Sequence, residues 1–395
     1  MFNVIASTIL VRFISEAATP VFGARNKTIA VPVDEGFTSV MIDGQEVELL
    51  VDSGSWDLIV IDGDWYEEKF GEGACGKPHS GCFFCPVEAP CDFDEEQTVT
   101  TTFADDVVIE RIFRTGRLVL AGNEVTRFVY SIARLTGNAT ERSANGYFGL
   151  ALRPPGSEQF ESPLYQRSVL EALFQRYLIG RLSYTTRSNG NQDSPFLSGQ
   201  VTLGDTIDES DLTNYMFPLW NDDEIHHRAF AAVSVLSVEV LHARRVSRGS
   251  RPAKSSLDFS GRRTNQSAFR AQIDTGFTGL YLLYPDLFEE IKKKLKRALR
   301  RAGHKELIWG RNEYGVAYVP EGVRPFLPVL RLRLGGGSNS IPINIFPEHY
   351  CLRTGQGYDV VLAGHAAHGA LGTPFFRAFS VHVDHSTSRI GLLKV

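Results

Sequence analysis

Two short segments of the same kind constrain the fold more than any other feature of this sequence. Segments 49–55 and 271–276 each carry an apolar run into Asp-(Ser/Thr)-Gly, which places Asp52 and Asp274 at matching positions. A second apolar run follows each segment, at 58–61 and at 280–283. Apolar runs interrupted by Asp and Gly predict a strand, a tight turn that presents the carboxylate, and a second strand.

A second motif follows each Asp at nearly the same distance. It consists of Gly, two further residues, the second of them apolar, and a final Gly. Its two copies end at Gly149, 97 positions after Asp52, and at Gly372, 98 positions after Asp274. A lone Asp-Ser-Gly is an ordinary turn sequence. Two motifs repeated at one spacing instead predict a duplicated lobe.

Together with these motifs, segment 370–379 (Ala-Leu-Gly-Thr-Pro-Phe-Phe-Arg-Ala-Phe) and the stretch that follows it resemble the closing segment of pepsin-like aspartic proteases. The chain is similar to that family from about residue 36 onward, as a divergent, fungal-type member. The resemblance implies a mainly β protein with a few short helices, arranged as two β-barrel-like lobes with a cleft between them. We expect a signal or N-terminal extension in residues 1–26, a first lobe in 27–208 and a second lobe in 209–395.

Composition agrees with a β-rich protein large enough for two cores. The chain has 395 residues, of which 43% are apolar, and its short apolar runs are broken by 36 Gly and 18 Pro. The formal charge of −5 favours no nucleic-acid partner. The basic, Ser- and Gly-containing stretch 242–270 is read as an exposed loop, with a polyanion-binding patch as the alternative. Helical spacing of apolar residues predicts a helix over 162–177 and another through the basic stretch 292–305, with its apolar positions at Phe288, Ile291, Leu295, Leu299 and Ala302.

Cysteine usage points to an oxidising compartment. Four Cys lie close together, at Cys75, Cys82, Cys85 and Cys91, and their spacing lacks the paired knuckles of a zinc ribbon, so we favour two local disulfides over a metal site. Cys351 stands in an apolar run and is expected to be a buried thiol. Three glycosylation sequons, at Asn26, Asn138 and Asn265, and an imperfect signal-like start favour a secreted, extracellular or vacuolar protein.

The chemistry expected of such a pair of Asp residues is acid–base catalysis. Two neighbouring carboxyl groups resist double ionisation, so one accepts a proton from a water molecule while the other donates one. Gly54 and Gly276 would let the backbone approach these groups closely. In the family, hydroxyls such as those of Ser53 and Thr275 brace the two loops, and Ser55 would add a hydrogen bond to Asp52.

Three positions depart from the family pattern. Phe277 stands where Ser or Thr usually follows the second Asp-Thr-Gly, so Thr278 would have to supply the hydroxyl. The resemblance aligns Phe103, Ala104 and Asp105 with the tip of the flap hairpin that covers the substrate, where a Tyr is usual. The Trp that usually partners this Tyr is Ile59 here.

The sequence therefore predicts an aspartic endopeptidase that favours acid pH and uses Asp52 and Asp274, without a metal or another cofactor. The resemblance implies an extended polypeptide substrate, inhibition by pepstatin-like compounds, and a monomer. The alternative is a catalytically weak or inactive binding protein that uses the same cleft, which Phe277 and the missing flap Tyr would favour. His365 and His368 lie close together but lack a carboxylate at a spacing suited to a metal site.

Overall fold

A computed structural model describes residues 27–103, 107–136, 144–153, 167–190, 194–207, 216–218, 230–242, 268–304, 309–312, 315–335, 340–355, 357–363 and 368–394. Several features expected from the sequence lie outside these residues. They are segment 1–26, the hairpin-tip residues Ala104 and Asp105, the three sequon asparagines, His365, most of the basic stretch 242–270, and the lobe boundary at 208.

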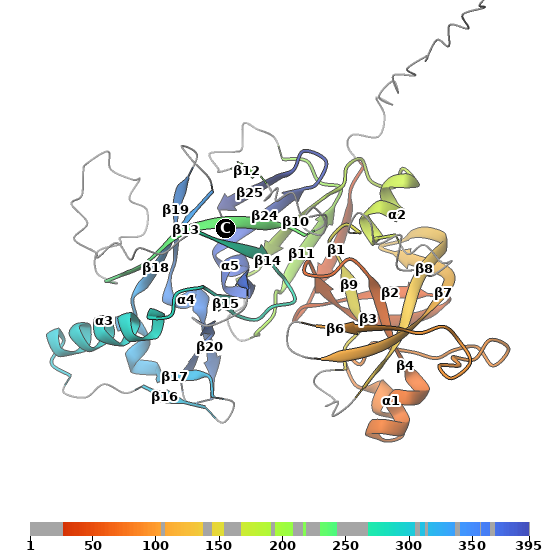
Figure 1. Cartoon of the computed structure of the whole chain (residues 1–395), viewed down its shortest axis with the longest axis horizontal. Coiled ribbons are helices and arrows are strands. Elements are labelled where there is room, and N and C mark those ends of the chain that lie inside the picture. Colours follow the sequence, from red (N-terminus) through yellow and green to blue (C-terminus); the bar gives the residue numbers. More distant parts are fainter. Residues whose placement is uncertain are drawn as a thin grey trace, which may run out of the picture.

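The first lobe is built on a sheet of eight strands (Figure 1). In order across the sheet these are β2 (Phe37–Ile42), β3 (Gln45–Asp52), β9 (Tyr147–Gly149), β4 (Leu58–Asp62), β8 (Asn123–Leu135), β7 (Val108–Leu120) and β6 (Val99–Thr102), with β5 (Cys82–Phe83) beside β4. The sheet also closes partly on itself, because β2 pairs with β7.

The second lobe carries a seven-stranded and a four-stranded sheet. The larger one contains, in order, β19 (Ile341–Ile345), β18 (Val329–Leu334), β13 (Ala232–Leu241), β14 (Phe269–Ile273), β23 (Gly369–Leu371), β15 (Leu280–Tyr281) and β22 (Leu362–Ala363). The smaller one contains β16 (Gly310–Arg311), β17 (Ala317–Pro320), β21 (Gly357–Val360) and β20 (Cys351–Thr354).

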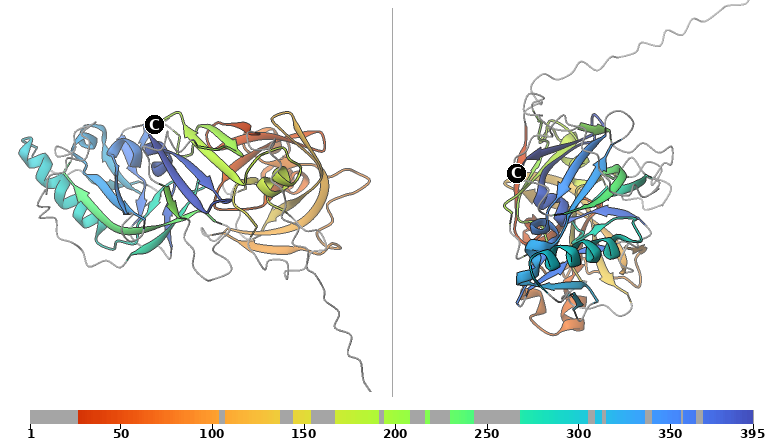
Figure 2. Two further views of the ribbon diagram at one scale, coloured as in Figure 1. Left: turned by 90° about the horizontal axis from the view of Figure 1, so that it is seen from above. Right: turned by 90° about the vertical axis from the view of Figure 1, so that its left-hand side faces the viewer.

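A six-stranded sheet joins the two lobes. Its order is β1 (Ile29–Val33), β11 (Gly199–Leu203), β10 (Ser183–Ser188), β24 (Phe379–Asp384), β25 (Arg389–Lys394) and β12 (Met216–Pro218). Strands from early, middle and late parts of the sequence thus lie in one sheet, with the lobes on either side (Figures 1 and 2). The predicted mainly β, two-lobed architecture is confirmed.

Local sequence accounts for the hairpin that leads to Asp52. Strands β2 and β3 pair in the register Ile42 to Gln45, so Asp43 and Gly44 form the connection. Both have positive φ angles, 48° and 87°, which Asp and Gly tolerate and which match the twist of a two-residue hairpin. The second predicted hairpin is formed by β6 and β7, which also pair antiparallel.

The helices are short and lie outside the sheets. They are α1 (Gly63–Phe70), α2 (Val169–Gln175), α3 (Leu287–Arg301), α4 (Pro347–Tyr350) and α5 (Thr373–Ala378), with 3-10 turns at Ala74–Gly76 and Glu321–Phe326. In α2, Ser168 and Glu171 form a reciprocal capping box, which fixes its start. In α3, the side chains of Leu287, Ile291, Leu295 and Leu299 are buried. The helix therefore covers almost the same residues as the helical spacing expected from Phe288 to Ala302.

Both predicted local disulfides are present, and the structure supplies the pairing that the sequence left open. Cys75 is bonded to Cys82, and Cys85 to Cys91. Cys351 is a buried free thiol, as expected. Within the described residues, no helix combines the length and the apolar character that a membrane crossing requires.

Candidate active site

Asp52 and Asp274 occupy equivalent places in two copies of one structural unit. β3 ends at Asp52 and runs parallel to β9, with Asp52 opposite Gly149. β14 ends one residue before Asp274 and runs parallel to β23, with Ile273 opposite Leu371. Each Gly-containing strand also pairs antiparallel with the strand that follows its Asp, β4 or β15. The two motifs repeated in the sequence are therefore neighbouring strands in both lobes.

Ser53 and Thr275 join the two Asp-containing turns by four reciprocal hydrogen bonds. The Ser53 N–H donates to Thr275 Oγ1 at 2.9 Å, and the Thr275 N–H donates to Ser53 Oγ at 3.0 Å. The hydroxyl of Ser53 donates to the carbonyl of Ile273 at 2.9 Å, and that of Thr275 to the carbonyl of Val51 at 2.7 Å. Both side chains are buried. Each turn donates two hydrogen bonds to the other and accepts two from it, so each lobe fixes the turn of the other.

The glycine after each hydroxyl residue lies against the carboxylate of the opposite lobe. A Cβ placed on Gly54 would lie 2.6 Å from Asp274 Oδ2, and one on Gly276 would lie 2.7 Å from Asp52 Oδ1. Each Gly also donates its backbone N–H to the carboxylate of its own turn, at 2.7 Å for Asp52 and 2.9 Å for Asp274. Only Gly leaves room for the two carboxyl groups to lie side by side.

The two carboxyl groups are within hydrogen-bonding reach of each other, and their environment favours one shared proton. Burial raises the pKa of Asp52, whereas the nearby polar groups of Ser55, Asp274 and the loop backbone lower it. Burial and then the negative charge of Asp52 raise the pKa of Asp274 well above its usual value. Because both pKa values are raised, the pair holds a shared proton over a wide range of pH, and the two carboxyls titrate as a unit.

The two turns differ in the hydroxyls that they offer. The hydroxyl oxygen of Ser55 is buried beside Asp52 and lowers its pKa, although it makes no hydrogen bond of normal geometry within the described chain. In the second turn, the groups that lower the pKa of Asp274 are the backbone N–H groups of Gly276 and Phe277. Thr278 makes no hydrogen bond to Asp274 within the described chain, so the structure does not bring together this expected pair. The ring of Phe277 instead packs edge-to-face on Tyr281, with centroids 4.2 Å apart.

The aromatic residue of the hairpin has a partner that the sequence did not indicate. Phe103 stacks on Tyr147, with centroids 4.8 Å apart and an angle of 24° between the rings. Tyr147 lies on β9 directly opposite Ile59 on β4. An aromatic side chain on the neighbouring strand thus lies opposite Ile59. This relation could be found only from the strand register.

A buried ion pair next to the first turn was also missed by the sequence reasoning. The guanidinium of Arg111, on β7, donates to Asp57 Oδ2, and both side chains are less than a tenth exposed. Burial raises the pKa of Asp57, and the charge of Arg111 lowers it. The Asp57 carbonyl also accepts the N–H of Gly149 at 2.9 Å. The pair therefore connects the Asp52 loop to the second strand of the hairpin.

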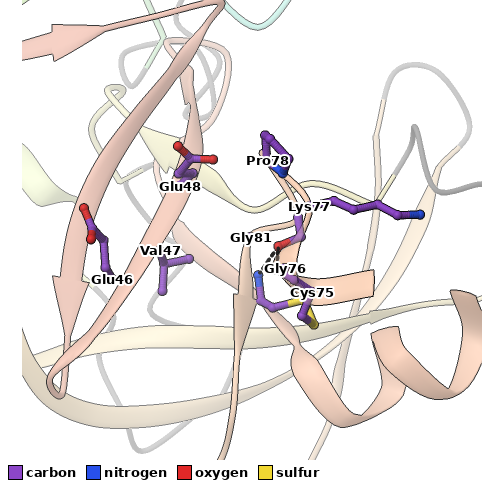
Figure 3. A pocket seen from close by; sticks show the side chains of 10 residues that line it. Glu46, Val47, Glu48, Cys75, Gly76, Lys77, Pro78 and Gly81 are labelled. Atoms are coloured by element: carbon purple, nitrogen blue, oxygen red, sulfur yellow. Dashed lines mark hydrogen bonds between the residues drawn. A yellow bond between two sulfur atoms is a disulfide. The ribbon is translucent and has the colours of Figure 1, made fainter. Parts of the chain in front are cut away.

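A separate hollow of about 430 Å³ lies on the first lobe, away from the carboxylate pair (Figure 3). Glu46 and Glu48 border it from β3, and Lys77 and Pro78 border it from the loop held by the Cys75–Cys82 disulfide. Within the described residues, no three His, Cys, Asp or Glu side chains gather as they would to hold a metal ion. The residues that line the hollow include neither Asp52 nor Asp274.

No family model matches the sequence, and no curated protein matches it. Among solved structures, the chain is similar to the aspartic proteinase from Irpex lacteus, with a TM-score of 0.61 and 15% sequence identity over 93% of this chain and 97% of that one. The chain therefore has the two-lobed, pepsin-like fold of an aspartic proteinase.

Proposed function

We propose that this protein is an aspartic endopeptidase in which Asp52 and Asp274 activate a water molecule that attacks a peptide bond. The observation that carries the proposal is the pairing of the two carboxyl groups across the lobes, with the opposite Gly against each. Two buried carboxyls with one shared proton supply a base and an acid at one place. The fold alone does not require this arrangement of side chains.

In the proposed reaction, ionised Asp52 removes a proton from a water molecule held between the carboxyls, and the resulting oxygen attacks the substrate carbonyl carbon. Asp274 donates its proton to the carbonyl oxygen, which gives a tetrahedral gem-diol. The carboxylate formed at Asp274 then takes a gem-diol proton back, Asp52 passes its proton to the amide nitrogen, and the C–N bond breaks. Each carboxyl returns to its starting state. Since the pair titrates as a unit, activity requires that it hold one proton.

We propose an extended polypeptide as the substrate, because β6 is the last strand in the order of the first lobe's sheet, so its outer edge can pair with a substrate strand. A pepstatin-like inhibitor would bind to the same carboxyls. The two disulfides support a secreted or vacuolar location, where thiols are oxidised. The reaction needs no cofactor, and a single chain supplies both Asp residues.

A second candidate function is a binding protein with weak or no catalysis. The observation that favours it is the second turn, where Phe277 replaces the usual hydroxyl residue and Thr278 does not bond to Asp274. One missing hydrogen bond to a charged group is worth about 1.5–3 kcal/mol, or roughly a ten- to hundredfold effect. That loss would slow the reaction without removing its essential groups, so we favour the enzyme.

The test is cleavage of unfolded casein by the purified protein over about pH 3–7, because the raised pKa values of both carboxyls move the one-proton state of the pair above the usual range for Asp. Asp52→Asn and Asp274→Asn should each abolish cleavage, and pepstatin should inhibit the wild type. Asp359→Asn is a matched control, because Asp359 is a partly buried carboxylate in the small sheet that bonds to Asn312 and not to the pair.

Cleavage that survives Asp52→Asn would reject the mechanism. A wild type that binds pepstatin but cleaves no peptide bond would favour the binding protein. Loss of cleavage in the Asp359→Asn control would show that the assay reports general damage to the fold.

A further inference from the structure

Helix α3 carries a net charge opposite in sign to that of the whole chain. Its residues Leu287–Arg301 include seven basic and two acidic side chains, whereas the chain has a formal net charge of −5. All three views of the fold place α3 at the outer end of the second lobe, on the side away from the first lobe (Figures 1 and 2). A partner bound to the outer side of α3 would therefore leave the turns that carry Asp52 and Asp274 uncovered.

The buried and the basic residues of α3 lie on opposite faces of the helix. Successive residues are rotated by about 100° around the axis, so the buried side chains of Leu287, Ile291, Leu295 and Leu299 form one stripe. Through this stripe α3 packs on β13 and on the 3-10 turn Glu321–Phe326. Four exposed basic residues lie on the opposite side, and we call them the basic face: Lys296, Arg297, Arg300 and Arg301. Their charged groups therefore point into solvent.

Ion pairs within α3 neutralise its first turns but not the basic face. Lys292 Nζ lies 3.1 Å from Glu289 Oε1, and Lys293 Nζ lies 3.8 Å from Glu290 Oε1. A hollow of about 460 Å³ beside these pairs is lined by three acidic and three basic side chains of the described chain, so it does not select an anion. Among the residues that the structure describes, no carboxylate lies within ion-pair distance of the basic face. Its positive charge is therefore available to a partner.

Only half of the basic face has a structural reason to be basic. Arg300 and Arg301 lie in the last turn, where the carbonyl end of the helix stabilises cations. Lys296 and Arg297 lie one turn earlier and gain little from this effect. Like charges at positions i and i+4 repel each other, and both Lys296–Arg300 and Arg297–Arg301 have this spacing. The four cations therefore destabilise the helix surface unless an anion binds there.

We propose that the basic face of α3 is a docking surface for a linear sulfated polysaccharide, a role separate from the proposed catalysis. Its residues form two pairs, 296–297 and 300–301, which are about 6 Å apart along the helix axis. A linear polymer with sulfate groups on successive sugars can contact both pairs at once. Three of the four side chains are Arg, whose planar guanidinium donates two parallel hydrogen bonds to one oxyanion.

Other polyanions fit this face less well. The apolar stripe of α3 is buried in the lobe, so the helix has no apolar face to insert into a lipid bilayer. The disulfides Cys75–Cys82 and Cys85–Cys91 favour an oxidising, extracellular compartment rather than one that holds nucleic acid. Sulfate groups also stay ionised at the acid pH of the proposed catalysis, whereas carboxylates begin to take up protons near about pH 4. These observations together favour a sulfated polysaccharide.

The test is titration of the full chain with heparin, as the sulfated probe, in a calorimeter at neutral pH. All proteins carry Asp52→Asn to prevent self-digestion, so the result does not depend on whether the wild type cleaves peptides. An exposed ion pair is worth roughly threefold in affinity, so replacing all four residues of the basic face by Gln should raise Kd about 100-fold. Lys296→Gln/Arg297→Gln keeps the two cations that stabilise the helix end, and it should raise Kd about tenfold. Circular dichroism should show both variants folded.

A matched control removes the same charge from the first lobe. It replaces four exposed basic residues there by Gln, namely Lys69, Lys77, Arg117 and Arg127, and its Kd for heparin should change less than about threefold. An equal loss of affinity in this control would overturn the inference, because the net charge of the chain would then explain the binding. A parent that does not bind heparin would also overturn it, as would basic-face variants that bind as tightly as the parent. Binding to vesicles of phosphatidylserine and phosphatidylcholine but not to heparin would instead assign the face to a membrane and reject the polysaccharide.

Discussion

His382 should make the protein lose stability as the pH falls toward the range where an aspartic endopeptidase works. It lies on β24, opposite Thr185 on β10, and its Nδ1 is 2.9 Å from Thr185 Oγ1. The side chain is 3% exposed. Burial lowers the pKa of His382 from 6.5 to about 4, although Asp384 and Asp205 partly oppose this. The perturbation that isolates its contribution is His382→Gln, which can still hydrogen-bond to Thr185 but cannot ionise.

The size of the effect follows from linkage. In the unfolded chain the imidazole binds a proton near pH 6.5, whereas in the folded protein it does so only near pH 4. The stability supplied by neutral His382 is therefore complete above about pH 6.5 and is lost as the pH falls to about 4. The two pKa values differ by about 2.5, and a difference of one in pKa is worth about 1.36 kcal/mol. The contribution of His382 to the free energy of unfolding is therefore about 3 kcal/mol.

The assay is urea denaturation at about pH 7 and about pH 4, with all proteins in an Asp52→Asn background to prevent self-digestion. Between these two pH values the parent loses free energy of unfolding, and His382→Gln should lose about 3 kcal/mol less than the parent does. His368→Gln serves as a control, because His368 is exposed. If the parent and His382→Gln lose the same free energy between the two pH values, the reasoning is wrong.

Three further substitutions probe the site. Gly54→Ala should lower kcat/KM at least about 100-fold while circular dichroism stays unchanged, because its Cβ would lie 2.6 Å from Asp274 Oδ2; near-normal activity would contradict the close packing. Phe277→Ser should raise kcat/KM about tenfold and move the alkaline limb to lower pH, because a hydroxyl bonded to the carboxylate formed at Asp274 lowers the pKa of the acid in the proposed reaction; a pH–rate profile checks this, and an unchanged limb would count against it. Arg111→Met should cost about 3–5 kcal/mol in chemical denaturation, since it leaves Asp57 buried without its partner. Most of that loss should return in Asp57→Leu/Arg111→Met, and an equally unstable double variant would show that packing, not charge, is responsible.

The sequence was most informative where a backbone requirement limits the choice of residue. Gly54 and Gly276 are the only residue type that fits against the opposite carboxylate, so the Asp-(Ser/Thr)-Gly turns could be recognised from sequence alone. The hairpin at Asp43 and Gly44 was predictable for the same reason, because both need a positive φ. At such positions the folded structure permits few residue types, so its requirement is visible in the sequence.

The contacts that were missed depend on strand register. Tyr147 becomes the partner of Phe103 only because β9 and β4 place it opposite Ile59. Arg111 and the next residue, Ile112, are both buried on β7, and the burial of Arg111 depends on Asp57, which is more than fifty residues away in sequence. Thr278 was expected to replace a hydroxyl by proximity in sequence, yet its neighbour Phe277 packs on Tyr281. Sequence spacing does not determine where such side chains point.

The sheet that joins the lobes also sets the time at which the site can exist during synthesis. β10 lies at the middle of the chain, but its neighbour β24 spans Phe379–Asp384, and β23, beside the Asp274 strand, spans Gly369–Leu371. A growing chain that has passed Asp274 therefore holds both carboxylates without the strands that support them. Because these pairings must wait for β23 and β24, a ribosome-bound chain would carry no competent carboxyl pair until both strands have been synthesised and have left the ribosome.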